Sequence, residues 1–252
     1  MRHMRTTALM LALAGVALLS GCASNGAKND NNDPYESVNR KMYNFNDVLD
    51  KNFFQPVARG YVKVTPDPVR SGVTNFFDNL GYLNVITNDL LQGKMKQTAL
   101  DSSRFVVNST VGIGGLFDPA TGFGLASHDE DLGQTFGVWG AGEGAYLVLP
   151  LLGPNSFRDA PNLASSMLLN PLTWINSVVT IPLGVLNAVN TRANLLEATN
   201  IRDQAALDPY TFVREAYRQQ REFKIYDGNP PADENDEYNV DAKGDQSVLK
   251  IY

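Results

Sequence analysis

The chain has 252 residues, a formal net charge of −6, two histidines and a single cysteine. Nucleic-acid affinity depends on neutralising phosphates, so an acidic chain without a basic stripe excludes nucleic acid as an expected partner. A single cysteine excludes a disulfide within the chain, and so few cysteines and histidines leave no ligand set for zinc.

Residues 1–21 have the layout of a secretory signal peptide. Two arginines precede a short apolar stretch, and "LSGC", ending at Cys22, resembles the lipobox of bacterial lipoproteins. We expect cleavage before Cys22 and acylation of that cysteine, because two acyl chains hold a protein stably on a membrane. No Asp stands beside Cys22, where Ala23 and Ser24 follow, and this absence resembles the sorting pattern for the outer membrane. Residues 22–32 then form the acylated cysteine and a polar tether.

A capping side chain followed by proline marks each expected helix start. Asp33-Pro34 is predicted to open the first helix, with Asp33 as its N-cap. The same pair recurs at Asp67, Asp118, Asn170 and Asp208. Strand patterns are scarce. We therefore expect an all-α domain over residues 33–226, followed by an acidic, disordered tail over residues 227–252.

Two of these helices have distinct faces. In the first, an apolar stripe at spacings of three and four is more often core than membrane contact; it comprises Tyr35, Val38, Met42, Phe45 and Leu49. The last clear helix runs from Pro209 to about Ile225. It sets Phe212, Ala216 and Phe223 against a charged face of Arg214, Arg218, Arg221 and Glu222.

Charged residues are missing from the middle of the chain. Residues 160–191 contain no Asp, Glu, Lys or Arg, whereas soluble domains carry about a quarter charged residues. Pro171, Pro182 and several asparagines interrupt this run, which excludes an ordinary transmembrane helix. Two interpretations stay open: shorter helices lying in or along a bilayer, or a large buried core of a soluble protein.

The stretch "GVWGAGEGAYLVLPLLGP" has the spacing of a dinucleotide-binding fingerprint, with Gly140, Gly142 and Ala145 at its three defining positions. That site needs a strand before the glycines and a long helix after them. Helix-like spacing precedes them and Pro150 follows soon after, so we expect no nucleotide and no other cofactor here.

No reaction chemistry is indicated elsewhere. His128 lies in the acidic segment "SHDED", which favours a solvated turn over a hydrolase base, and the chain has no G-x-S-x-G motif. Residues 129–131 are acidic but lack the later acid of a calcium loop. They are expected to cap a helix N-terminus. We therefore predict no catalytic residues and no bound metal.

Several segments together resemble the MlaA (VacJ) family of outer-membrane lipoproteins, in the same order and over most of residues 33–226. The most specific is the glycine-rich segment that ends in Leu-Gly-Pro and Arg-Asp. The segments include "DPYESVNRKMYNFNDVLD", "FFDNLGYLNVITNDLLQGK", "RFVVNSTVGIGGLFDPA", "FGVWGAGEGAYLVLPLLGPNSFRD" and "DPYTFVREAYRQQREF".

The resemblance implies both a fold and a function. Members of this family are ring-shaped bundles of amphipathic helices around a central channel, embedded mainly in the inner leaflet of the outer membrane. They remove mislocalised phospholipid from the outer leaflet and pass it to a periplasmic carrier of the MlaC type, and porin trimers usually hold them. This chain is then expected to be a non-enzymatic, lipid-anchored channel on the periplasmic side of the outer membrane.

The resemblance also implies site residues. Gly140, Gly142 and Gly144 would form a hinge flanking a hairpin that gates the channel. Tyr43, Asn44, Phe45 and Asn46 would lie in the first helix, beside the lipid path. Relatives often have proline where this chain has Ala145, so the loop here is expected to be less rigid. Arg158 and Asp159 are expected to pair with each other rather than contact headgroups.

Two other functions remain open at this point. One is a structural envelope lipoprotein that scaffolds porins without moving lipid. The other is an enzyme with an apolar pocket that acts on lipids.

Overall fold

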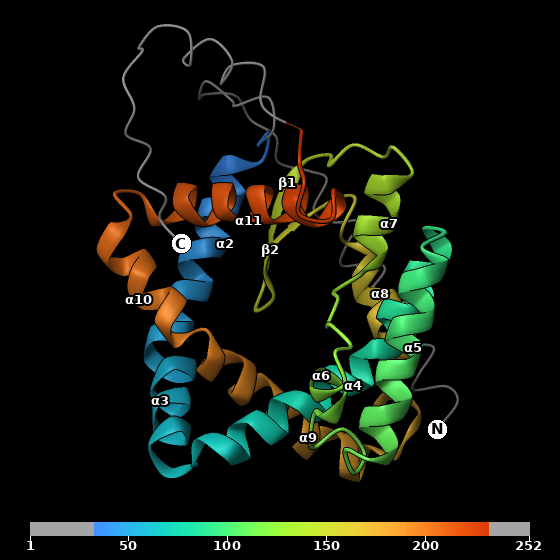
Figure 1. Cartoon of the computed structure of the whole chain (residues 1–252). Coiled ribbons are helices and arrows are strands. Elements are labelled where there is room, and N and C mark those ends of the chain that lie inside the picture. Colours follow the sequence, from blue (N-terminus) through green and yellow to red (C-terminus); the bar gives the residue numbers. More distant parts are fainter. Residues whose placement is uncertain (1–32, 232–252) are drawn as a thin grey trace, which may run out of the picture.

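In the computed structural model, which describes residues 33–231, most of the chain is helical (Figure 1). Its elements follow in the order α2 (Glu36–Leu49), η2 (Asp50–Phe54), α3 (Gln55–Val64), α4 (Asp67–Leu91), α5 (Met95–Thr110), α6 (Pro119–Gly122), α7 (Leu132–Val138), β1 (Tyr146–Leu149), β2 (Gly153–Ser156), α8 (Pro161–Leu169), η3 (Pro171–Trp174), α9 (Ser177–Asn194), α10 (Leu196–Ala205) and α11 (Pro209–Ile225). Here η2 is a π-helix and η3 a 3₁₀-helix. The all-α expectation holds for this scaffold, to which the structure adds one short β-hairpin.

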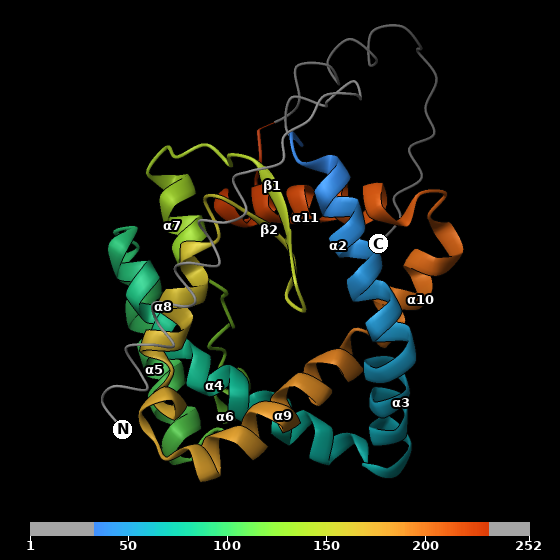
Figure 2. The same ribbon diagram turned by 180° about the vertical axis from the view of Figure 1, so that it is seen from behind.

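The helices are arranged around a ring, and the hairpin points into it (Figures 1 and 2). α2, η2 and α3 form one side of the ring. α4 and α9 contact each other and cross the end next to α3, while α5, α7 and α8 lie on the opposite side. α11 closes the ring, because it contacts α7, β2 and α10.

Three of the five expected capping residues act as predicted. Asp118, Asn170 and Asp208 each accept a hydrogen bond from a backbone N–H two or three residues later. Asp67 does begin α4, but its carboxylate pairs with an arginine of the same helix instead of capping it. The predicted cap at Asp33 is wrong. α2 begins three residues later, and the Asp33 carboxylate is buried against α11.

The interior of the described chain is polar, and much of its surface is apolar. Among residues 33–231, eight hydrophobic residues are buried against eighteen polar or charged ones. Large hydrophobic side chains are exposed on helices from α2 to α11. In water, each Å² of apolar surface that stays exposed loses about 25 cal/mol of the stabilisation that its burial would provide. Large exposed apolar surfaces mark contact with a membrane or another protein.

The apolar face of α2 lies on the surface, so the expectation that it is core is wrong. Tyr35, Val38 and Phe45 are 39%, 41% and 55% exposed. From this stripe, Met42 packs against the buried aromatic cluster. The buried residue of α2 is Asn39. Burying the apolar face is favourable only where water surrounds the protein, and apolar surroundings reverse the preference.

On α11, two arginines of the charged face are buried, although Glu222 is exposed. Arg214 and Arg221 are each 8% exposed, whereas Phe212 and Phe223 are exposed. Buried charges need partners, and both arginines have carboxylates within 3.0 Å. These partners are Asp33 for Arg214, and Asp131 and Asp159 for Arg221.

The uncharged run over residues 160–191 covers α8, η3 and most of α9, and it lies at the surface. In this run, which the structure describes throughout, the one buried residue is Asn190. The interpretation as a large buried core is therefore wrong. The interpretation as helices lying in or along a bilayer stays a prediction. The exposed apolar side chains of the run include Met167, Leu168, Trp174, Val178, Ile181 and Val185.

Across residues 33–231, the structure contains no helix whose length and hydropathy would let it cross a membrane. Three expectations lie outside the described residues: the signal peptide over residues 1–21, the acylated Cys22 with its tether over residues 22–32, and most of the tail over residues 227–252.

Arg221→Ala should destabilise the protein strongly, because it leaves the Asp131 carboxylate without its arginine and removes one of the two arginines that pair with the buried Asp159. The free energy of unfolding should fall by about 3–5 kcal/mol, the usual cost of breaking a buried ion pair from one side. Lys224→Ala on the same helix is the matched control. Its partner Asp129 is exposed, so the loss should stay below about 1 kcal/mol. Thermal denaturation in detergent measures both, and equal losses would contradict the importance of the buried pair.

Candidate functional site

The hairpin links the sequence-predicted site residues. β1 and β2 pair antiparallel, with Tyr146 opposite Ser156. Tyr146 and Val148 enter a buried cluster with Tyr210 of α11. The ring of Tyr146 lies 6.2 Å from the ring of Tyr210 and 5.9 Å from that of Tyr217, in tilted and edge-on arrangements that favour aromatic pairs. Aromatic packing therefore fixes the base of the hairpin between α2 and α11.

The four residues predicted for the lipid path in the first helix lie on different faces of α2. Tyr43 packs against the aromatic cluster at the base of the hairpin. Asn46 makes two hydrogen bonds of 2.9 Å to the backbone around the hairpin turn. Asn44 and Phe45 are exposed instead, with Phe45 part of the apolar outer face. Two of the four residues thus contact or support the hairpin, and two do not.

The three glycines of the predicted hinge differ in conformation. Gly140 has φ 90° and ends α7 with the two backbone hydrogen bonds of a Schellman motif, at 2.8 and 2.9 Å. Gly144 has φ 71°, and a Cβ there would lie 3.0 Å from the Cβ of Phe157. Gly142 has neither constraint, since its φ is not positive and a Cβ would meet nothing within 4 Å. Gly140 and Gly144 therefore have static structural reasons to be glycine, and Gly142 has none.

A pocket of about 580 Å³ lies between this glycine loop and α11. Glu143, flanked by two of the glycines, faces Arg218 across it, with 3.7 Å between Oε1 and Nε. Burial raises the pKa of Glu143, and the positive charges of Arg218 and Arg158 only partly oppose that rise. This carboxylate is held less tightly than those bound to Arg214 and Arg221. The loop is thus attached to α11 by a long ion pair.

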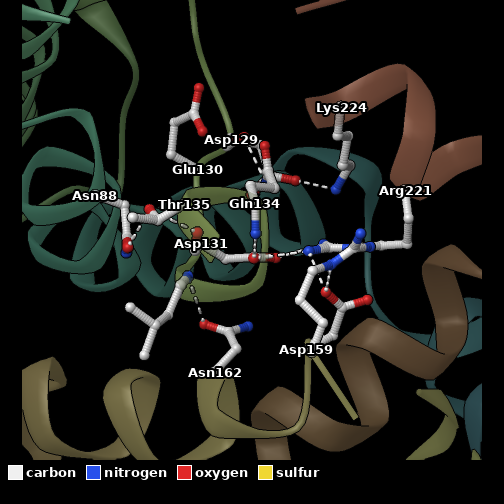
Figure 3. Close-up of polar contacts among 12 residues, drawn as sticks. Asn88, Asp129, Glu130, Asp131, Gln134, Thr135, Asp159, Asn162, Arg221 and Lys224 are labelled. Atoms are coloured by element: carbon white, nitrogen blue, oxygen red, sulfur yellow. Dashed lines mark hydrogen bonds and ion pairs between the residues drawn. The ribbon is translucent and has the colours of Figure 1, made fainter. Parts of the chain in front are cut away.

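A network of buried charges fastens α11 to the segment before the glycine loop (Figure 3). Arg221 donates to Asp131 at 2.5 and 2.8 Å and to Asp159 at 3.0 Å. Asp131 also caps α7, as expected, by accepting from the backbone N–H of Gln134 at 2.8 Å. Burial acts to raise the pKa of Asp131, but its bonds to Arg221 outweigh burial and lower it. A Cβ at Gly133 would collide with Asp159, so the contact requires glycine there.

Arg158 pairs with Asp159, as expected, with 3.1 Å between Nε and Oδ1. Tyr217 donates a hydrogen bond of 2.5 Å to the other oxygen of Asp159. Burial alone would raise the pKa of Asp159, but this hydrogen bond and Arg221 lower it. The aspartate is therefore ionised at neutral pH and belongs to the structural network.

His128 is part of a second polar cluster, next to a pocket of about 520 Å³ between α4, α8 and residues 127–131. Its Nδ1 lies 3.0 Å from the buried carboxylate of Asp101. The turn is partly solvated, as expected, since Ser127 and Asp129 are exposed, but His128 also contacts the interior. The neighbouring Ser127 hydroxyl lies 2.8 Å from the hydroxyl of Tyr82. Burial, followed by the nearby Asp101, raises the pKa of Asp89 to about 7. Among residues 33–231, no group of His, Cys, Asp and Glu is arranged to hold a metal ion.

Comparison with known proteins assigns the family. The model of the MlaA lipoprotein family matches residues 31–224. The chain belongs to the MlaA lipoprotein family. Its relatives include the intermembrane phospholipid transport system lipoproteins MlaA of Escherichia coli, 36% identical over 92% of this chain and 93% of that protein, and of Haemophilus influenzae, 31% identical over 89% and 93%.

A solved structure described as the structural basis for maintenance of bacterial outer membrane lipid asymmetry has the same fold. It matches with a TM-score of 0.68 and 33% sequence identity, and covers 77% of this chain and 98% of that chain. The expected family is therefore confirmed, and with it the mainly helical architecture.

Two residues of this MlaA family member were missed from sequence. Asp33 was predicted to be a cap, and Asn39 was not singled out. Both are buried at the junction of α2, β1 and α11, where Asn39 donates hydrogen bonds of 2.9 Å to Asp33 and to the Tyr146 carbonyl. Tyr146 lies 107 residues from Asn39 along the chain, and Arg214, the partner of Asp33, lies 181 residues from it. In the sequence, a polar residue within the apolar pattern of α2 could have indicated that Asn39 is buried.

The Gly142→Ala variant distinguishes a role of Gly142 in loop movement from a role in the static structure of the loop. The site has room for a methyl group and needs no positive φ, so the melting temperature should stay close to that of the natural protein. If this loop is a hinge, alanine should change lipid transport by about two- to fivefold, the equivalent of the 0.4–1 kcal/mol by which alanine restricts a flexible glycine. Phospholipid exposed at the cell surface provides the measurement.

Gly140→Ala is the contrasting variant. It should lower the stability by about 1–2 kcal/mol, because alanine is strained at φ 90°. Unchanged lipid exposure in a stable Gly142→Ala protein would remove the hinge role.

Proposed function

We propose that this chain is a channel that takes mislocalised phospholipid out of the outer leaflet of the outer membrane and passes it to a periplasmic carrier. Support comes first from family membership, since relatives that match over about nine-tenths of the chain are named as intermembrane phospholipid transport lipoproteins. The structural relative concerns outer-membrane lipid asymmetry.

The observation that carries the proposal is the inverted distribution of side chains. An apolar outer surface can contact acyl chains, whereas polar groups in the interior can accompany a headgroup. A charged headgroup that crosses hydrocarbon unaided faces a penalty of several kcal/mol or more. Polar groups along a path lower that barrier without any covalent step. The mechanism therefore needs binding and release, and no nucleophile or cofactor.

The anchor and the partners complete the proposal. Acylation of Cys22 would hold the chain on the periplasmic side of the outer membrane, and the ring of helices would lie mainly in the inner leaflet. By family resemblance, an outer-membrane porin trimer surrounds part of the apolar surface, and a carrier of the MlaC type receives the lipid. The exposed apolar run over α8, η3 and α9 is the surface best suited to acyl chains or a porin.

A clean deletion tests the function. Cells that lack the chain should expose more phospholipid at their surface, measured with an amine-reactive probe that does not cross the membrane. Re-expression of the chain should restore the low level. If the protein only scaffolds porins, surface phospholipid stays normal while porin assembly changes. If it acts as a lipid enzyme, lysophospholipid or free fatty acid disappears on deletion.

A further inference from the structure

The outer edge of β1 is hydrogen-bonded by two asparagine side chains instead of by a third strand. Asn39 donates to the Tyr146 carbonyl and accepts from the Val148 N–H, both at 2.9 Å. Asn46 donates to the Leu149 carbonyl and accepts from the Leu151 N–H, again both at 2.9 Å. A carboxamide carries one acceptor and one donor group in the arrangement of a peptide unit, so each asparagine completes a piece of ladder.

The hairpin sequence creates the need for these bonds. Pro154 lies opposite Val148 in the antiparallel register. Because proline has no N–H, it fits at a strand position whose backbone does not donate a hydrogen bond to the neighbouring strand. Val148 then directs its own N–H away from β2 and toward α2. An unpaired strand edge is costly to bury and prone to wrong pairing, and the asparagines of α2 cover it.

The spacing of the two asparagines matches the strand. They are seven residues apart on α2, a rise of about 10.5 Å along a helix. The groups they bind are centred three residues apart on the hairpin, at 147 and 150. Three residues of extended chain rise about 10 Å, and the turn that begins at Pro150 brings the second pair of groups to the same side as the first. One face of α2 can therefore hold the strand and the turn beyond it at the same time.

The turn that Asn46 holds is strained and apolar. Leu151 has φ 65°, a conformation that costs a non-glycine residue about 1–2 kcal/mol. Such strain persists where the surroundings impose it. Leu151 and Leu152 are each 63% exposed. Both leucines lie in the turn between β1 and β2. The hairpin points into the ring of helices in both views (Figures 1 and 2).

We propose that Asn39 and Asn46 are positioning residues that lock the hairpin to α2, and that the leucines of the locked tip contact the acyl chains of a passing phospholipid. This inference rests on the proposed function. It makes α2 and the hairpin one rigid body. A change of conformation in the glycine loop then moves α7 relative to α2 and the hairpin. It does not move the hairpin away from α2.

Asn46→Ala tests the lock, because both of its hydrogen bonds here go to the hairpin, whereas Asn39 also binds Asp33. Hydrogen exchange of the full chain in detergent should show the Leu151 amide exchanging about tenfold faster, since two net hydrogen bonds are lost. Asn44→Ala, at an exposed position on the same helix, is the matched control and should leave that amide protected. Unchanged exchange at Leu151 in Asn46→Ala would overturn the lock.

Leu152→Ser tests the acyl-chain contact without touching the lock. Exchange at Leu151 should stay as in the natural protein, while cells whose only copy is this variant should clear surface phospholipid about fivefold more slowly. Asn46→Ala should raise surface phospholipid as well. Normal clearance in Leu152→Ser would overturn the contact. If the deletion itself left surface phospholipid normal, the proposed function would fail, while the exchange data would still decide the lock.

Discussion

Pairing of buried charges is the constraint on which this structure depends. The interior holds carboxylates and guanidinium groups that would be costly to bury unpaired. The ion pairs of Arg214 with Asp33 and of Arg221 with Asp131 and Asp159 also join segments that are distant along the chain. Arg214 ties the start of the described chain to α11, and Arg221 ties α11 to the start of α7 and to Asp159 after the hairpin. α11 thereby closes the ring by ion pairs in addition to the aromatic cluster around Tyr210.

Because the interior is polar, the apolar side chains lie on the outer surface. This distribution explains why a long surface segment lacks charged residues. Residues 160–191 carry no charge and lie almost entirely at the surface, over α8, η3 and α9. In water this arrangement would favour aggregation. Against acyl chains it is stabilising, and the same inversion supplies the polar groups that phospholipid transport requires.

The sequence predicted local structure better than it predicted which side faces inward. Asx-Pro pairs marked the starts of η3 and α11 correctly, because capping is a contact between near neighbours. The apolar face of α2 was predicted to be core and lies at the surface, since amphipathic patterns are normally interpreted with water outside. The asparagine lock was beyond prediction, because Asn39 and Val148 are 109 residues apart. Gly140 was singled out as a hinge, and the structure shows a helix cap there as well.

The most direct test of the inverted arrangement uses Trp174, which is 73% exposed in the uncharged run. The chain has two tryptophans, so Trp139→Phe leaves Trp174 as the single fluorophore. After reconstitution into phospholipid vesicles, we predict strong quenching by phospholipids brominated on their acyl chains and little quenching by aqueous iodide. Strong quenching by iodide with none by the brominated lipids would place this surface in water and contradict a membrane-embedded ring.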